Sequence, residues 1–316
     1  MKFISLTFVL VAACVCQLPG DARAQSPRSE QAAPLAKAAT GPAPIHFHYF
    51  DAGLTSSPAH PLDTKSLQAL GQRWVAQCSE GGQFASLAAT FAPNPSFSAK
   101  EREALSKRFD QARFEALATA AWRKANATLP QAAPLNLCVE LVDAHSEFIT
   151  KAMHGVTGLT AGSGRIMLKV SVDADWARML PYALAHELHH SYWASHDFDP
   201  AKPFSLLDYM VFEGRADYFA HLLYPDTFAP WDEALTDSQF AALWPRLRGD
   251  ADSTDFAMMR AVMFGDPRQQ IPQWAGYSVG YRLVAQRMQL KPAMDIATMT
   301  AAPASAFLPA VPVNGR

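Results

Sequence analysis

Residues 181–196 read PYALAHELHHSYWASH and contain the pattern His-Glu-x-x-His at His186, Glu187 and His190. The stretch is predicted to be helical. Four residues of an α-helix turn the chain by about 400°, so the two histidines project about 40° apart and one turn from each other. Both imidazoles can therefore reach one zinc ion, and the sequence predicts a metal site on this helix.

Glu187 flanks the same face of this helix. A carboxylate there can accept a proton from a water molecule whose pKa a zinc ion has lowered toward 7. Glu187 is therefore the predicted catalytic residue of a hydrolase that attacks a carbonyl with zinc-bound water. The alternative is that the histidines are core side chains, hydrogen-bonded to their neighbours, in a metal-free fold. His189 is expected to be packed rather than to be a ligand.

A catalytic zinc site needs a third protein ligand and one open position. Glu213 lies 23 residues beyond His190, on the next predicted helix. Asp217 follows four residues later on the same helix face, where it can hydrogen-bond a ligand imidazole and fix its tautomer. We expect Glu213 to be the third ligand.

Two other residues compete for this role. His196 gives the spacing HExxHxxxxxH of the metzincin signature. That signature has Gly, which allows φ > 0, at the position that Trp193 occupies here. The other competitor is Asp197.

The motif AHELHH followed by EGRAD at residues 213–217 resembles the gluzincin pattern of thermolysin-like metallopeptidases. Together with WAGYSVGY at residues 274–281, it is more closely similar to a bacterial domain-of-unknown-function family of predicted zinc-dependent proteases, over roughly residues 154–284. The resemblance implies a zincin-like fold, a bound Zn²⁺ ion and peptide hydrolysis. Tyr277 and Tyr281 stand four residues apart in WAGYSVGY. They are expected to pack a helix, and the alternative is that a phenol stabilises an oxyanion.

The composition indicates a folded body without a charged binding surface. The chain has 316 residues, of which 49% are hydrophobic, and its 27 basic and 29 acidic residues give a net charge of −2. This balance argues against nucleic acid or a polybasic membrane surface as partner. The expected partner is a peptide or protein substrate.

The first 24 residues read as a secretory signal peptide, with an apolar stretch and a small-residue cleavage site before Gln25. An alternative is a lipobox that ends at Cys14, which would give a lipid anchor. Either predicts a periplasmic or secreted protein without a transmembrane span after processing. In this oxidising setting, Cys78 and Cys138 are predicted to form a disulfide.

The predicted fold class is α+β and mostly helical, with a small sheet beside the active-site helix. A disordered linker (25–44) precedes an N-terminal part of the globular body (45–153), a zincin-like catalytic region (154–300) and a loose C-terminal tail (301–316). Strands are predicted at 45–51, 135–142 and 166–172, with a glycine-punctuated loop before the last of these, which is a candidate edge strand for an extended peptide. Helices are predicted at 62–78, 100–127, from a start between 173 and 180 through the motif, 205–223, 237–247 and 277–288.

The competing function is that of a catalytically inactive zincin-fold protein of the cell envelope, which binds a peptide or a partner without cleaving it. Replacement of Glu187 separates the two, because only an enzyme depends on that carboxylate.

Overall fold

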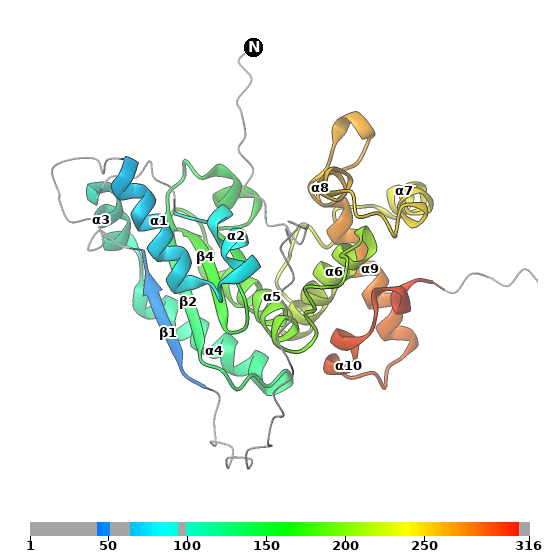
Figure 1. Cartoon of the computed structure of the whole chain (residues 1–316), viewed down its shortest axis with the longest axis horizontal. Coiled ribbons are helices and arrows are strands. Elements are labelled where there is room, and N and C mark those ends of the chain that lie inside the picture. Colours follow the sequence, from blue (N-terminus) through cyan, green and yellow to red (C-terminus); the bar gives the residue numbers. More distant parts are fainter. Residues whose placement is uncertain (1–42, 51–63, 94–98, 310–316) are drawn as a thin grey trace, which may run out of the picture.

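The computed structural model describes residues 43–50, 64–93 and 99–309. The fold is α+β, as predicted, with one four-stranded sheet and ten α-helices in these ranges (Figure 1). The strands are β1 (Ile45–Tyr49), β2 (Leu135–Val142), β3 (Val156–Thr160) and β4 (Arg165–Ser171). The helices are α1 (Thr64–Cys78), α2 (Gly82–Thr90), α3 (Ala99–Arg108), α4 (Gln111–Thr128), α5 (Trp176–His196), α6 (Leu206–Leu223), α7 (Asp237–Gly249), α8 (Phe256–Phe264), α9 (Ala275–Leu290) and α10 (Ile296–Ala301).

The sheet has the strand order β1-β2-β4-β3. β1 and β4 both run parallel to β2, whereas β3 is antiparallel to β4 and places Gly158 opposite Leu168. The strand predicted at 166–172 forms, but it lies inside the sheet, so the prediction that it is the edge strand is wrong. β3 is the edge strand instead, and it occupies the stretch that the sequence predicted as a loop.

Side chains of β2 alternate between two hydrophobic clusters. Leu137 and Val139 belong to the main cluster with residues of α4 and α5, and Cys138 belongs to a smaller cluster with Trp74 of α1. The sheet is therefore covered on both faces, and its interior strand β2 is buried along nearly its whole length. Residues from both predicted parts of the body, before and after position 154, share the main cluster.

The predicted disulfide between Cys78 and Cys138 is confirmed. It joins the last residue of α1 to the middle of β2. In the chain-entropy model, a loop closed over 60 residues contributes about 4 kcal/mol to the free energy of unfolding.

The single helix predicted over 100–127 is two helices, α3 and α4. Asp110 lies between them, and its side chain accepts a hydrogen bond from the backbone N–H of Arg113. An aspartate in this position caps a new helix, which explains the break.

α5 lies between the sheet and the C-terminal helices (Figure 1) and contacts β3, β4, α4 and α6. Pro181 lies inside it, at the sixth residue, so the helix begins upstream of the proline at Trp176. Ser205 and Asp208 form a capping box that fixes the start of α6.

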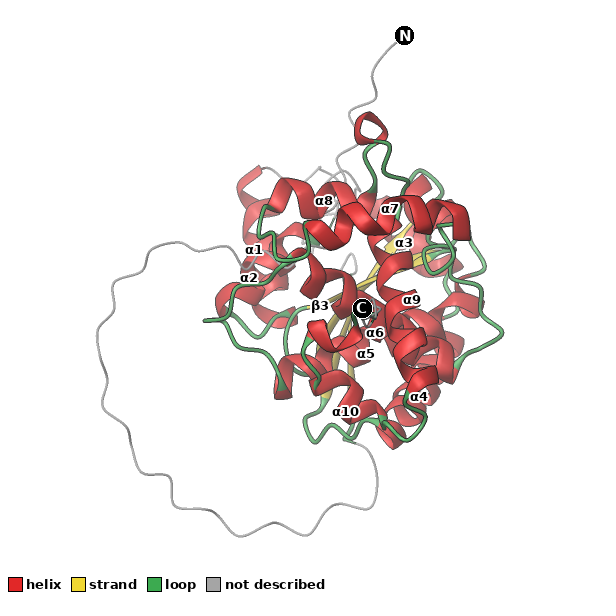
Figure 2. Cartoon of the chain, turned by 90° about the vertical axis from the view of Figure 1, so that its right-hand side faces the viewer, coloured by secondary structure: helices red, strands yellow, loops and turns green. Residues whose placement is uncertain are grey.

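α6 and α9 pack with their backbones in contact, and Figure 2 looks onto this helical side of the molecule. A Cβ atom at Gly280 would lie 1.8 Å from the carbonyl oxygen of Met210, and one at Gly214 would lie 2.1 Å from the carbonyl carbon of Gly280. The absence of a side chain at both positions permits this close helix packing. Gly214 directly follows Glu213, so this crossing fixes the backbone that carries the predicted third ligand.

The C-terminal segment is packed up to residue 309, which corrects the prediction of a loose tail over 301–316. Phe307 is 2% exposed, and the guanidinium of Arg215 lies over its ring. Arg215 also donates hydrogen bonds to the carbonyl oxygens of Thr300 and Ala302. Residues 310–316 lie outside the described residues, as do the predicted signal peptide and the linker up to residue 42.

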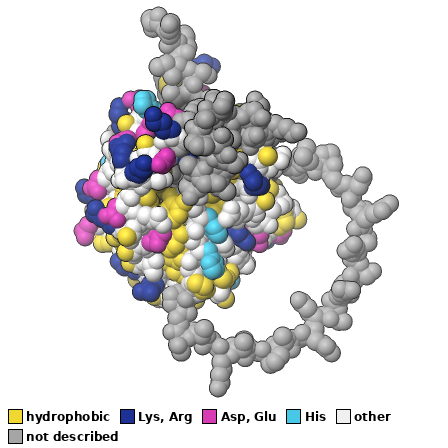
Figure 3. All heavy atoms as spheres, turned by 90° about the vertical axis from the view of Figure 1, so that its left-hand side faces the viewer, with side chains coloured by type: hydrophobic (Ala, Val, Ile, Leu, Met, Phe, Trp, Pro, Cys, Tyr) yellow, Lys and Arg dark blue, Asp and Glu magenta, His cyan; other side chains and the backbone are white. Residues whose placement is uncertain are grey.

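The surface mixes both signs of charge. Figure 3 shows basic and acidic side chains interspersed on one face of the molecule, as the balanced composition suggests. Among the helices of the described residues, none has the length and apolar character needed to cross a membrane.

Candidate metal centre

Three side chains from two helices converge on one point. His186 and His190 come from adjacent turns of α5, and Glu213 comes from α6. Nε2 of His186 lies 3.0 Å from Nε2 of His190 and 3.2 Å from Oε2 of Glu213. Nε2 of His190 lies 3.4 Å from the same carboxylate oxygen. Within the described residues, these three are the only group of His, Cys, Asp and Glu side chains arranged to hold a metal ion.

The spacing of the three atoms fits a zinc ion. Ligand atoms about 2.05 Å from a tetrahedral ion lie about 3.3 Å from one another, which matches the three measured separations. Two imidazole nitrogens and one carboxylate oxygen form a common catalytic zinc set, and they leave a fourth position open.

Asp217 fixes the orientation of His186. Its Oδ1 lies 2.7 Å from Nδ1 of His186 and accepts a second hydrogen bond, of 2.9 Å, from the indole N–H of Trp231. With Nδ1 as the donor, the lone pair of Nε2 is free to face the metal position. Burial lowers the pKa of His186, but the carboxylates of Asp217 and Glu213 outweigh it and hold the pKa well above its ordinary value.

Glu213 is almost fully buried, and the electrostatics of the cluster keep it ionised. Burial alone would raise its pKa, but His190 and His186 outweigh this and lower the pKa to about 2. A carboxylate that is ionised at neutral pH beside two imidazoles is a ligand set that suits a divalent cation such as zinc.

Behind Asp217 lies a second buried acid, Asp232. It accepts a hydrogen bond of 2.7 Å from the hydroxyl of Tyr182, which also lies on α5. Burial, followed by the charge of Asp217, raises the pKa of Asp232 well above its ordinary value. Sequence reasoning missed Tyr182, Trp231 and Asp232, because no motif spacing connects them to the histidines.

Glu187 points from α5 toward β3. Its Oε2 accepts a hydrogen bond of 2.8 Å from the hydroxyl of Thr160, and a Cβ atom at Gly158 would lie 2.5 Å from its Cγ. Burial raises the pKa of Glu187, while the nearby His186 and His190 oppose that shift. Thr160 was missed because its strand was predicted as a loop.

A family model described as "Predicted Zn-dependent protease (DUF2268)" matches residues 114–309, which contain all three side chains of the cluster and Glu187. The chain belongs to this family. The resemblance stated from the motifs is thereby confirmed, and the family description suggests a zinc-dependent hydrolase. α1 and α2 lie before the matched residues.

Over 119 residues, the chain is 30% identical to the uncharacterized protein YjfC of Bacillus subtilis. This alignment covers 34% of the chain and 40% of YjfC, so the chain spans less than half of the curated relative that it matches. No solved structure matches the chain significantly.

The two residues considered as alternatives to Glu213, His196 and Asp197, are not part of the cluster. α5 is continuous through Trp193, so the chain does not reverse there as the metzincin signature requires. Nδ1 of His196 contacts the hydroxyl of Ser195 and the carbonyl oxygen of Tyr192. Asp197 is the C-cap residue that follows α5. His189 is fully buried, and its Nε2 lies 3.0 Å from the hydroxyl of Thr300, so the expectation that it is packed is confirmed.

The two tyrosines of WAGYSVGY are subject to different buried carboxylates. Burial and then the charge of Glu213 raise the pKa of Tyr277 well above its ordinary value. The pKa of Tyr281 is raised to about 12 by burial and then by Asp232. Both tyrosines are on α9, the helix that crosses α6 at Gly280.

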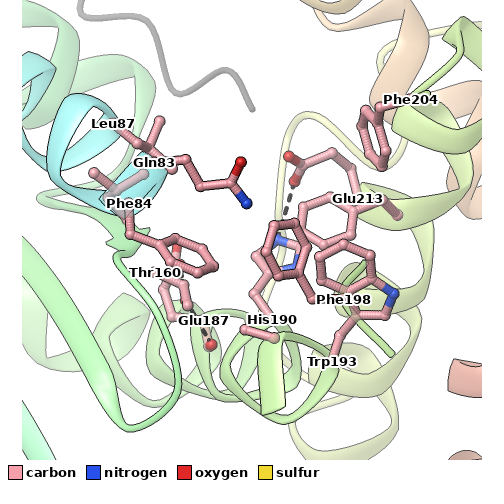
Figure 4. A pocket seen from close by; sticks show the side chains of 13 residues that line it. Gln83, Phe84, Leu87, Thr160, Glu187, His190, Trp193, Phe198, Phe204 and Glu213 are labelled. Carbon is pink, nitrogen blue, oxygen red and sulfur yellow. Dashed lines mark hydrogen bonds and ion pairs between the residues drawn. The ribbon is translucent and has the colours of Figure 1, made fainter. Parts of the chain in front are cut away.

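A hollow opens beside the metal cluster (Figure 4). Glu187, His190 and Glu213 form one part of its wall, and the rest is mainly apolar. A water-sized group can occupy about 70 Å³ of it, and it is partly open to solvent.

Proposed function

We propose that the chain is an exported zinc-dependent peptidase, in which His186, His190 and Glu213 hold the ion and Glu187 is the general base. The observation that carries the proposal is the triangle of ligand atoms, with sides of 3.0, 3.2 and 3.4 Å, on an HExxH helix and its neighbour. The family description supports both zinc and proteolysis.

A bound zinc ion would supply a Lewis acid that acidifies water and polarises a substrate carbonyl. Glu187 then accepts a proton from the attacking water and delivers it to the leaving nitrogen. The hydroxyl of Thr160 holds the Glu187 carboxylate in place for both transfers. Asp217 holds His186 in the tautomer that faces the ion.

The edge of β3 can align an extended peptide with these groups. The carbonyl oxygen of Gly155 and the N–H of Ala161 are hydrogen-bonded to residues at the two ends of β4. In an antiparallel pair, every second residue bonds to the partner strand and the residues between them face away. The N–H and C=O groups of Gly158 and Thr160 therefore point to the open edge of β3. A peptide added as a strand there would bind through its main chain and pass beside Glu187.

Export is proposed from the signal peptide over residues 1–24, with the lipid anchor at Cys14 as the alternative. The Cys78–Cys138 disulfide supports an oxidising compartment.

The test compares wild type, Glu187→Gln and Glu103→Gln on a library of peptides, with zinc measured in each protein. Glu103 is an exposed residue of α3, paired with Lys107, and serves as the matched control. We expect Glu187→Gln to retain zinc and lose about 10²- to 10⁴-fold in rate, and the control to match wild type. Absence of cleavage by all three proteins would favour the inactive, partner-binding alternative, whereas equal measurable rates would contradict the role of Glu187 as general base.

A further inference from the structure

The hollow beside the metal cluster is formed by three parts of the chain. Figure 4 shows side chains of α2 on one side and Phe204 and Glu213 on the other, with Thr160 of β3 and with Glu187 and His190 of α5 below them. Besides residues of the metal cluster, its lining includes Phe84, Leu87, Trp193, Phe198 and Phe212.

The α2 wall lies outside the residues that the family model matches. Two connections hold it in place. The Cys78–Cys138 disulfide anchors the end of α1 to the sheet. Glu80, between α1 and α2, binds the β3–β4 turn, because its N–H donates to the carbonyl oxygen of Ala161 and its carboxylate accepts from the N–H of Ser163.

The opposite wall is an aromatic cluster. Phe212 stacks on the ring of His190 at 3.9 Å between centroids and packs against Trp193 at 4.9 Å. Phe198 connects the two walls, since its ring lies 5.4 Å from Trp193 and 5.2 Å from Phe84 of α2. The aromatic ring of Phe212 therefore packs directly on His190, a predicted zinc ligand.

The hollow suits one kind of side chain. Among the described residues that line it, the charged or titratable ones are Glu187, His190 and Glu213, which the metal centre uses. A charged substrate side chain would find no free counter-charge there and would be desolvated. Phe84, Leu87 and Phe198 are only half-buried, so an apolar side chain would cover surface that water now contacts.

We propose that α2 of this chain completes a specificity pocket that takes an apolar side chain, aromatic or aliphatic, from the substrate residue next to the cleaved bond. This inference rests on the proposed peptidase function. It assigns a role in the substrate site to Phe84 and Leu87, which precede the family's matched region.

The experiment profiles the cleavage of a peptide library by zinc-loaded full-length protein, using wild type, Leu87→Arg and Phe84→Ala. Leu290→Arg and Phe228→Ala are the matched controls, because these residues are 69% and 54% exposed and do not line the hollow. Zinc content and a thermal melt establish that each variant folds. The same proteins are titrated with two peptide hydroxamates that differ only in carrying a benzyl or a carboxymethyl side chain.

Wild type is expected to cleave next to Phe, Leu, Met or Trp and to bind the benzyl hydroxamate at least tenfold more tightly. Phe84→Ala should lose about tenfold in kcat/KM on aromatic peptides, and Leu87→Arg should shift the preference toward Glu and Asp. Both controls should behave as wild type. If Leu87→Arg does not fold, the kcat/KM of Phe84→Ala on aromatic peptides tests the pocket.

Two failures are distinguishable. Cleavage without an apolar preference, or with a preference that neither variant alters, would overturn the pocket and leave the peptidase standing. Absence of cleavage together with a retained benzyl preference would overturn the peptidase function. Absence of cleavage and of the benzyl preference would overturn the peptidase proposal and the pocket proposal together.

Discussion

Nδ1 of His186 on α5 lies 2.7 Å from Oδ1 of Asp217 on α6, although 31 residues separate the two in the sequence. This contact orients the imidazole, so that its other nitrogen faces His190 and Glu213. The metal centre therefore depends on the packing of α5 against α6 as well as on the three ligand side chains.

Asp217→Asn should weaken zinc binding by about 10- to 100-fold, because an amide can present its NH₂ group to Nδ1 and favour the wrong tautomer. Competition with a zinc chelator measures the affinity. The control is Asp237→Asn, since Asp237 is 98% exposed at the start of α7. Unchanged affinity in Asp217→Asn would contradict the role of this contact.

Gly158→Ala should displace the Glu187 side chain, since the added methyl group would lie 2.5 Å from its Cγ. We expect a loss of hydrolysis of at least tenfold with zinc retained, because Glu187 is not one of the three ligands. Gly71→Ala in α1, where a Cβ atom meets nothing within 4 Å, is the control. Full activity in Gly158→Ala would mean that Glu187 does not act from its place beside β3.

Asp232→Asn should change how stability depends on pH. The pKa of Asp232 is raised by burial and then by Asp217, so the folded state keeps a proton that the unfolded chain releases above a pKa of about 3.9. Its contribution to stability is fully present below about pH 4 and is lost as pH rises toward the folded pKa.

Asn cannot titrate, so the free energy of unfolding of Asp232→Asn should rise relative to wild type as the pH increases from about 4 toward the folded-state pKa of Asp232, by up to about 1.4 kcal/mol per pH unit. Urea unfolding of the metal-free proteins measures it, with the exposed Asp226→Asn as control. Parallel pH profiles for wild type and Asp232→Asn would show that Asp232 is ionised in the folded state.

The sequence predicts the elements that have strong local signals. The spacing within HELHH and the later Glu213 and Asp217 locate the candidate centre, because helix geometry turns sequence spacing into position. The helix predicted over 205–223 is α6, and the structure adds the capping box of Ser205 and Asp208 that fixes its start.

The elements that were missed depend on tertiary contacts. β3 contains Gly158, which lowers strand propensity, yet glycine is needed there because Glu187 lies against the strand. α2 has nine residues and was not predicted, and it packs beside α1, which the disulfide anchors. Asp232 reaches the centre through folding alone, 15 residues beyond Asp217 in a segment without a motif.

The central claim is that His186, His190 and Glu213 hold one zinc ion, and the most direct measurement is zinc per chain in purified protein. Wild type, Glu213→Ala and His196→Ala are compared after identical zinc loading and dialysis. The account predicts about one zinc in wild type and in His196→Ala, and a loss of zinc in Glu213→Ala. A loss in His196→Ala with retention in Glu213→Ala, or no zinc in wild type, would contradict it.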